Sequence, residues 1–275
     1  MISIIFVTYN SKDIIAQSLK GLAGMQGAEI ILVDNASKDV TCELVREQFP
    51  SVKIIENDKN LGYGRAVNQA IKIAEGDKVL ILNPDVTTNI EDVNQLVNDA
   101  DKVENPGCIA PLTDENAEIS DKFENVEWVS GAAMMMPKNI FDEVGYFDEN
   151  IFLYYEETDL LKRICDQGYN IYLDNAVKMP HLVGKSSAYN KKTEYLKYWH
   201  SGWSKFYYIK KHYPKRFFVK SLGALIKNSF KYVIYLISFK PDKRLKYSAR
   251  FSGLLAFLTG KKAFDKAGNP RGLKD

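Results

Sequence analysis

The stretch Lys78-Val79-Leu80-Ile81-Leu82-Asn83-Pro84-Asp85 decides the fold class of this chain. Its apolar part, Val79–Leu82, is typical of a strand buried on both faces of a parallel sheet. Asp85 follows that run and therefore stands beyond the carboxyl end of the strand. Ligands bind at the carboxyl ends of strands in open α/β sheets. The stretch thus predicts a buried strand that presents a carboxylate to a ligand.

Strands and helices alternate in the first part of the chain. We expect strands over Ile2–Thr8, Glu29–Val33, Val52–Glu56 and Lys78–Leu82. We expect helices from Ser11 to about Ala23, from Ser37 to about Phe49, over Arg65–Ala74 and near Glu91–Val103, with the two serines as N-caps. This βαβ order predicts a doubly wound sheet with right-handed crossovers.

The order of elements changes after Pro106. Strands are expected over Cys108–Ala110, Trp128–Met136, Asn170–Leu173 and Val177–Met179. Helices are expected near Lys138–Val144 and over Thr158–Gln167, with Gly168 ending the second one. The fold class is therefore α/β, with a first half over residues 1–105 and a second half over residues 106–190.

Charge divides the chain into two parts. Residues 1–184 hold 15 Lys/Arg and 31 Asp/Glu, a net of −16, whereas residues 185–275 hold 22 Lys/Arg and 4 Asp/Glu, a net of +18. Such asymmetry indicates a basic region that faces an anionic partner. The 275 residues suit one large domain or a domain with an appendage. We expect the catalytic domain over residues 1–190 and a C-terminal helical region over residues 191–275.

The basic C-terminal region is also aromatic and amphipathic. Apolar segments at Leu222–Phe239 and Phe251–Leu258 are interrupted or flanked by Lys and Arg, which suits a membrane interface. The alternatives are a helical appendage packed on the core and a contact in a homo-oligomer. We expect no nucleic-acid partner, because no nucleic-acid motif accompanies the charge.

Other features of the sequence indicate the cellular compartment. The chain shows no signal peptide, and no apolar run reaches the about 18 residues of a spanning helix. Its three cysteines form no CxxC pair, as is typical of a reducing compartment. We therefore expect a cytoplasmic protein, peripheral on the inner face of the cell membrane.

Several polar groups follow the expected strands and form a candidate nucleotide site. Thr8-Tyr9-Asn10 follows the first strand and Asp34 the second, where a carboxylate can accept a hydrogen bond from a pyrimidine N3–H or a ribose hydroxyl. The alternative is that Asp34 caps the next helix as a turn residue. Asn60, Gly62 and Arg65 belong to a glycine-containing segment that opens a helix and could approach phosphate. The alternative is an ordinary loop.

Three further positions carry candidate chemistry. Asp85 and His181 could hold Mg²⁺ or Mn²⁺ that bridges two phosphates, with the imidazole favouring Mn²⁺ slightly. Glu156 and Glu157 belong to an acid-rich helix start, where one raised pKa would suit a general base. Favourable charge at a helix N-terminus is the plainer interpretation. Tyr155 before them could form part of an acceptor pocket.

Residues 2 to about 212 resemble family 2 glycosyltransferases of the GT-A fold, especially the bacterial rhamnosyltransferase-like branch. The resemblance depends on an ordered set of short motifs. They are Ser3–Asn10, Val33–Ser37, Asn60–Gly64, Leu82–Asp85, Trp128–Ala132, Gly145–Glu149, Tyr155–Leu160 and His181–Ser186. The resemblance implies a GT-A fold, with a nucleotide-sugar-binding half over residues 1–105 and an acceptor-binding half over residues 106–190. It also implies an inverting transfer from a nucleotide-activated sugar, dTDP-rhamnose or a UDP-hexose.

The resemblance also implies roles for particular residues. Asp34 would contact the base, Asp85 and His181 the metal, and Glu157 would be the catalytic base. Trp128, Ser130 and Gly131 would shape the sugar or acceptor side, where the acceptor is an oligosaccharide or a lipid-linked saccharide. Asn83 replaces the first Asp of the family's DxD motif, and Glu157 stands where Asp is common. The donor site would therefore hold one carboxylate fewer.

Two other functions remain open at this point. A sugar-nucleotidyltransferase shares the general sheet, but it would carry a glycine-rich loop directly after the first strand, where this chain has Asn10-Ser11-Lys12-Asp13. A non-catalytic, membrane-associated scaffold would retain the fold with a decayed site. The presence of Asp85, Glu157 and His181 argues against that decay.

Overall fold

The computed structural model describes residues 1–182, 190–237 and 240–272. The chain forms two compact units. The sheet unit comprises Met1–Asn60, Arg65–Phe147 and Glu157–Ala188, and the helical unit comprises Leu61–Gly64, Asp148–Glu156 and Tyr189–Asp275.

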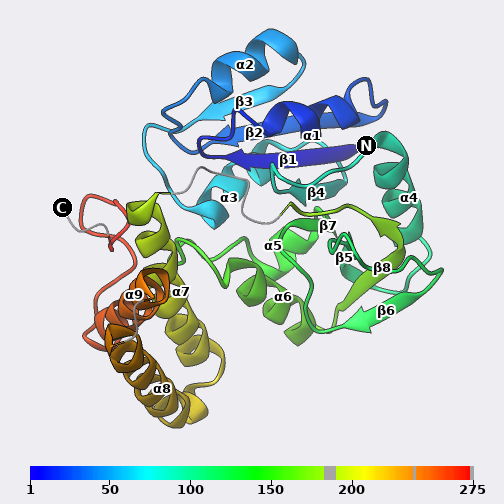
Figure 1. Cartoon of the computed structure of the whole chain (residues 1–275). Coiled ribbons are helices and arrows are strands. Elements are labelled where there is room, and N and C mark those ends of the chain that lie inside the picture. Colours follow the sequence, from blue (N-terminus) through cyan, green and yellow to red (C-terminus); the bar gives the residue numbers. More distant parts are fainter. Residues whose placement is uncertain (183–189, 238–239, 273–275) are drawn as a thin grey trace. The chain divides into compact units, whose positions relative to one another are not determined.

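The sheet unit contains a mixed sheet with the strand order β3-β2-β1-β4-β7-β5-β8-β6 (Figure 1). The strands are β1 (Ile2–Thr8), β2 (Ala28–Asp34), β3 (Lys53–Glu56), β4 (Lys78–Leu82), β5 (Pro106–Leu112), β6 (Phe123–Val126), β7 (Ala133–Pro137) and β8 (Asn170–Lys178). Strands β1 to β4 run parallel, whereas β7 is antiparallel to both β4 and β5. The predicted α/β class is confirmed.

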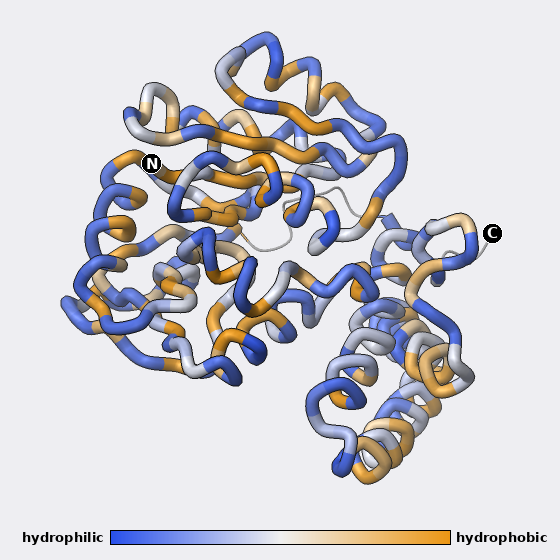
Figure 2. Tube along the Cα trace, turned by 180° about the vertical axis from the view of Figure 1, so that it is seen from behind, coloured by the Kyte–Doolittle hydropathy of each residue, from blue (hydrophilic) through white to orange (hydrophobic). Residues whose placement is uncertain are grey.

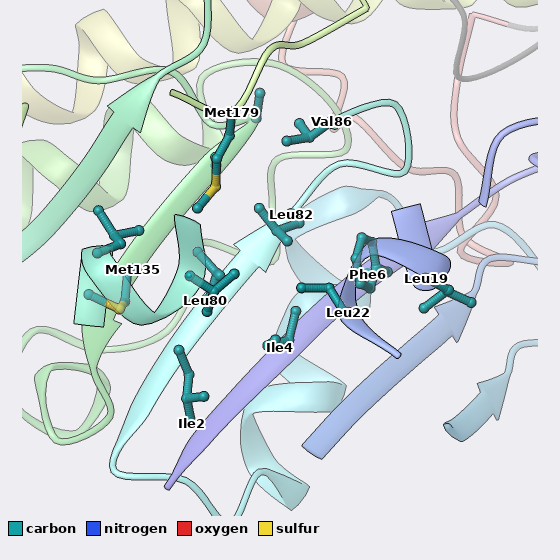
Figure 3. Close-up of a cluster of buried hydrophobic side chains, with 14 of the residues drawn as sticks. Ile2, Ile4, Phe6, Leu19, Leu22, Leu80, Leu82, Val86, Met135 and Met179 are labelled. Carbon is teal, nitrogen blue, oxygen red and sulfur yellow. The ribbon is translucent and has the colours of Figure 1, made fainter. Parts of the chain in front are cut away.

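Six helices connect these strands. They are α1 (Ile15–Leu22), α2 (Thr41–Gln48), α3 (Tyr63–Ile73), α4 (Ile90–Ala100), α5 (Ile140–Val144) and α6 (Glu156–Asp166). All seven residues of β1 are buried, as expected for a strand covered on both faces. Alternate residues of β1 and β4, including Ile4, Phe6 and Leu80, pack with Leu19 and Leu22 of α1 in one core (Figure 3). Figure 2 shows long hydrophobic stretches within the sheet unit.

Two predicted helix caps are wrong. Helix α1 begins at Ile15 and α2 at Thr41, and neither has a side-chain cap. The Ser11 hydroxyl instead accepts a hydrogen bond from the Tyr9 amide at 3.3 Å. The Ser37 hydroxyl is engaged by Asp34 and by the Asn10 amide. Both serines therefore organise the loops after β1 and β2.

The second half of the sheet differs from the expectation in three places. The strand expected over Trp128–Met136 is limited to Ala133–Pro137, since residues before it approach α6. Strand β6 was not expected, because the edge segment Phe123-Glu124-Asn125-Val126 has no apolar run. The two short strands expected after Gly168 form one continuous strand, β8, because its polar middle pairs with β6.

The helical unit contains α7 (Lys191–His212), the short 3₁₀ helix η1 (Pro214–Arg216), α8 (Phe217–Ile237) and α9 (Pro241–Leu258). Its core is aromatic and includes Phe152, Trp199 and Trp203. Helices α7 and α9 approach closely, because a Cβ added at Gly253 would lie 2.0 Å from the Trp199 carbonyl oxygen. Within the described ranges, no helix has the length and hydrophobicity needed to cross a membrane.

Candidate functional site

Three neighbouring strands end at the same edge of the sheet. Thr8 of β1 pairs with Asp34 of β2, and Leu82 of β4 pairs with Phe6 of β1. Asp85 follows β4 directly. The parallel register therefore gathers the polar groups that follow β1, β2 and β4 at one edge of the sheet unit (Figure 1).

Asp34 is almost completely buried, with 4% of its surface exposed, and it is heavily hydrogen-bonded. Its Oδ1 accepts from the Thr8 hydroxyl at 3.0 Å and from the Ser37 hydroxyl, and its Oδ2 accepts from the Ser37 amide at 2.8 Å. Asp34 thus forms a turn with Ser37, but it does not cap α2, which begins at Thr41 without a side-chain cap. Two oxygens with three such contacts retain acceptor capacity, because a carboxylate offers about four lone-pair sites.

The loops after β1 and β2 hold each other in place. The Asn10 side chain accepts a hydrogen bond from the Lys38 amide at 2.7 Å, and Asn10 has a positive φ of 54°. The Asn35 amide group donates to Asn60 Oδ1 at 3.0 Å. Tyr9 is 36% exposed next to these groups in sequence. The structure therefore brings Thr8, Asn10 and Asn60 into one polar network with residues that precede α2.

Asp85 and His181 meet directly. The Nε2 of His181 lies 3.0 Å from Oδ1 of Asp85, and the Asp85 side chain is 1% exposed against 20% for His181. Backbone contacts hold both residues, since Leu182 N donates to Asp85 O at 2.9 Å and His181 N donates to Thr113 O at 3.0 Å. The juxtaposition spans 96 positions of sequence.

This pair fits part of a divalent cation site. One carboxylate and one imidazole suit Mn²⁺ or Mg²⁺ when phosphate oxygens and water supply the other ligands. Among the described residues, no group of three or more His, Cys, Asp and Glu side chains could hold a metal. The residue two positions before Asp85 is Asn83, which has an amide in place of a carboxylate. The Asn83 backbone amide donates to the Ala132 carbonyl at 2.8 Å and so connects the end of β4 to the start of β7.

Glu157 lies in the first turn of α6, and its environment suits a proton acceptor. Burial raises the pKa of this carboxyl above its usual value, whereas its contacts with Thr158 and Trp128 lower it. The Thr158 hydroxyl donates to Glu157 Oε1 at 3.1 Å, and Trp128 Nε1 donates to the same hydroxyl at 3.3 Å. Burial, and not the neighbouring acid that the sequence suggested, is the largest cause of the raised pKa.

Gly131 allows the close approach of Glu157. A Cβ added at Gly131 would lie 3.2 Å from both Cβ and Cγ of Glu157. The neighbouring Ser130 hydroxyl accepts from the Ala132 amide at 3.3 Å, which shapes the turn before β7. Because Ala132 also binds Asn83, a short run of contacts connects the end of β4 to Glu157.

Three of the predicted site residues, Gly62, Tyr155 and Glu156, belong to the helical unit. Gly62 has a φ of 88°, and an added Cβ would lie 2.5 Å from the Phe152 carbonyl oxygen, so its glycine is required by the backbone. Tyr155 also has a positive φ, and its ring centroid lies 5.5 Å from that of Tyr208. Glu156 is 7% exposed. The binding roles of these residues and of Arg65, which is half-buried in the first turn of α3, remain predictions.

The sequence interpretation missed Thr158 as the partner of Glu157. A threonine at a helix start is an ordinary feature, and its sequence context carries no sign that it also contacts Trp128, 30 positions away. Trp128 makes that contact from the loop between β6 and β7, so the contact depends on how this loop folds.

Comparison with known proteins identifies the family. The model of glycosyl transferase family 2 matches residues 3–155. The N-acetylglucosaminyl-diphospho-decaprenol L-rhamnosyltransferase of Mycobacterium tuberculosis is 25% identical over 266 residues, covering 74% of this chain and 86% of that protein. The low-salt glycan biosynthesis hexosyltransferase Agl10 of Haloferax volcanii is 26% identical over 199 residues, covering 62% of this chain and 63% of that protein.

Solved structures share the fold at low sequence identity. The mannosyltransferase PcManGT from Pyrobaculum calidifontis, in complex with GDP-Man and Mn²⁺, has a TM-score of 0.62 and 15% identity, with 94% of this chain and 87% of that chain covered. The TarS fragment 1–349 from S. aureus, in complex with UDP-GlcNAc, has a TM-score of 0.58 and 16% identity, with 94% and 92% covered. With the strand order and the match to more than half of the chain, the conclusion is that this protein belongs to glycosyl transferase family 2 and has the GT-A fold.

Proposed function

We propose that this glycosyltransferase transfers a sugar from a nucleotide diphosphate donor with inversion, and that it depends on Mn²⁺ or Mg²⁺. The observation that supports this most strongly is the 3.0 Å contact between Asp85 and His181 after the buried strand β4. These two side chains would hold the cation against the donor diphosphate. The bound metal would supply charge stabilisation to the leaving diphosphate.

Glu157 is the proposed catalytic base. The acceptor hydroxyl gives its proton to the Glu157 carboxylate, while the hydroxyl oxygen forms a bond to the anomeric carbon of the donor sugar. The bond from that carbon to the diphosphate breaks, and the nucleoside diphosphate leaves with the electron pair. A single attack of this kind inverts the anomeric configuration. The raised pKa of Glu157 supports its role, because a stronger base accepts a proton more readily.

Thr158 and Trp128 are the proposed positioning residues for that base. The hydroxyl of Thr158 receives a hydrogen bond from the indole and gives one to the carboxylate, so the three side chains form a directed chain. This chain of contacts would hold the Glu157 carboxylate in one orientation. Trp128 is 52% exposed, which suits stacking against a sugar ring as well.

The donor is dTDP-rhamnose by preference and otherwise a UDP-hexose. Asp34 would accept the N3–H of the pyrimidine, with Thr8, Tyr9 and Asn10 beside it and Asn60, Gly62, Arg65 and Asn83 on the sugar-phosphate part. The acceptor is a saccharide or a lipid-linked saccharide of a cell-surface polysaccharide, approached by Ser130, Gly131, Tyr155 and Glu156. The relative named as a rhamnosyltransferase for a decaprenol-linked acceptor supports this choice.

A transfer assay with a panel of labelled donors, with membranes as the acceptor source, tests the proposal. We expect label to enter the lipid fraction from one pyrimidine donor, only when Mn²⁺ or Mg²⁺ is present. The parallel measurement is metal-dependent thermal stabilisation by dTDP or UDP. The stabilisation should reach about 2.7 kcal/mol when the nucleotide concentration is a hundred times its dissociation constant. Absence of stabilisation by any pyrimidine nucleotide would favour the non-catalytic scaffold.

A further inference from the structure

Helix α8 has a broad apolar face exposed to solvent. Its large side chains are far more exposed than any in the core. They are Phe218 (76%), Val219 (74%), Leu222 (49%), Ile226 (63%), Phe230 (67%), Val233 (52%), Ile234 (42%) and Leu236 (48%). Spacings of three and four place most of them on one side of the helix. Exposed apolar patches of this size mark an interaction surface.

The opposite side of α8 packs on α9. Tyr232 stacks on Phe251 at 6.4 Å between ring centroids, and Tyr235 stacks on Tyr247 at 5.2 Å. Lys231 Nζ donates to the Tyr247 hydroxyl at 3.1 Å. Helix α8 is therefore anchored within the helical unit, and its exposed face is additional to the face that the fold requires.

Lysines line one edge of the exposed face. Lys220, Lys227 and Lys231 lie between the exposed face and the packed face, since they follow one another at spacings of seven and four residues. No Asp or Glu occurs between Glu194 and Asp242. Positive charge therefore accumulates here. One consequence is in α7, where burial first, and then the charges of Lys227, Arg250 and Lys220, lower the pKa of Lys205.

A second copy of this chain is the less suitable occupant of this face. Pairing two copies of α8 would bring two rows of lysines together, and α8 offers no carboxylate to pair with them. An anionic lipid surface supplies both the apolar interior and the negative charge that this helix lacks. Charge complementarity therefore selects lipid over a second copy.

We propose that α8 lies in the plane of an anionic lipid surface, with its exposed face (Phe218, Val219, Leu222, Ile226, Phe230 and Val233) inserted below the headgroups and Lys220 and Lys227 bound to them. A helix of 21 residues spans about 30 Å, and such faces enter the headgroup boundary by about 5–10 Å. The inference deepens the proposed function and rests on its lipid-linked acceptor. It explains how a chain without a spanning helix in its described part could act on a lipid-linked acceptor.

Vesicle flotation with the full chain tests the inference. We expect the wild type to float with phosphatidylcholine vesicles that contain phosphatidylglycerol, and to float less with phosphatidylcholine alone. The double variant Ile226→Glu/Phe230→Glu should lose binding by about tenfold or more, because charge is excluded from the apolar boundary. Ile119→Glu, an equally exposed isoleucine of the sheet unit at 59%, is the matched control and should bind as the wild type does.

Insertion itself is measured with Phe230→Trp. Its emission should shift to the blue on vesicle binding and be quenched by brominated acyl chains, whereas Ile119→Trp should show neither change. Lys220→Gln and Lys227→Gln should each weaken binding about fivefold at low salt, and the difference should shrink as salt rises.

Two results would overturn the inference. One is a wild type that does not bind anionic vesicles, or a double variant that binds them equally well. The other is a dimer in sedimentation that the double variant converts to monomer, which would assign the face to a second copy. Stabilisation by dTDP or UDP, measured without vesicles on the same proteins, distinguishes this failure from failure of the proposed transferase function.

Discussion

The two units use apolar residues in opposite ways. In the sheet unit, aliphatic side chains of β1 and β4 are completely buried, and polar groups gather where these strands end. In the helical unit, the core is aromatic, and α8 leaves large apolar side chains in solvent. The sheet unit thus has the properties of a scaffold for chemistry, whereas the helical unit has those of a surface for attachment.

Because of this difference, substitutions in the two units should affect different properties of the protein. Polar residues at the sheet edge should affect transfer with little effect on folding. Core residues of β4 should affect folding, and exposed residues of α8 should affect neither folding nor donor binding.

The largest effect is expected for Asp85→Ala. Loss of the carboxylate that meets His181 should remove metal-dependent donor binding and lower transfer by about 10³-fold, because a metal contributes several kcal/mol of charge stabilisation. Calorimetric titration with dTDP or UDP in the presence and absence of Mn²⁺ is the measurement. Unchanged metal-dependent binding would show that the cation is held elsewhere.

The second largest effect concerns the free energy of unfolding, which alanine substitutions in the two units should change by different amounts. Leu80→Ala in β4 removes a completely buried side chain and should lower the free energy of unfolding by about 2–5 kcal/mol. Phe230→Ala in α8 should change it by less than about 0.5 kcal/mol, because that ring is 67% exposed. Urea denaturation of the two variants provides the comparison. A large loss in Phe230→Ala would mean that α8 is covered in the native protein.

Gly131→Ala should impair catalysis without loss of donor binding. The new methyl group would lie 3.2 Å from Glu157 and should displace the carboxylate by a few tenths of an ångström. Misplacement of a catalytic group by about 1 Å can cost about 10²-fold, so we expect a loss of about tenfold in kcat. Steady-state kinetics with the preferred donor measure it. Gly223→Ala in α8, where an added Cβ meets nothing within 4 Å and φ is not positive, is the control for glycine loss in general.

The smallest effect concerns Asp174, a buried acid of β8 to which no role in transfer is assigned. Burial and the neighbouring Asp99 raise the pKa of Asp174 to about 6. Because the pKa of this carboxyl is higher in the folded protein than in the unfolded chain, ionising it lowers the free energy of unfolding. This loss of stability is absent below the unfolded pKa near 3.8 and grows as pH rises through about 6. Asp174→Asn should therefore gain more in melting temperature over the wild type at pH 8 than at pH 4. Scanning calorimetry at both pH values tests the sign, and a lower melting temperature at pH 8 would contradict it.

Much of the sheet could be predicted from the sequence, for a physical reason. The strands Ile2–Thr8 and Lys78–Leu82 have the bounds that their apolar runs predict, since burial on both faces leaves a continuous pattern. Strand β6 was missed, because an edge strand with alternating polar residues carries a weak pattern. The wrong caps at Ser11 and Ser37 have another cause, since hydroxyls can serve loops as readily as helix ends.

The candidate site could be predicted in part. Asp85 was found because it ends a recognisable strand, and its contact with His181 depends on strand pairing that no local pattern reveals. The contact of Glu157 with Thr158 and Trp128 depends on a loop conformation and was not foreseen. Local signals therefore located the strand ends, while the contacts between them required the structure.

Glu157→Gln isolates the proton transfer to the proposed base, and its transfer rate is the decisive measurement. This variant keeps the shape of the side chain and can still accept from Thr158, but it cannot take a proton from the acceptor. The account predicts donor binding equal to that of the wild type, with transfer reduced by at least about 10²-fold. Transfer at the wild-type rate, with donor binding intact, would contradict the assignment of Glu157 as the base.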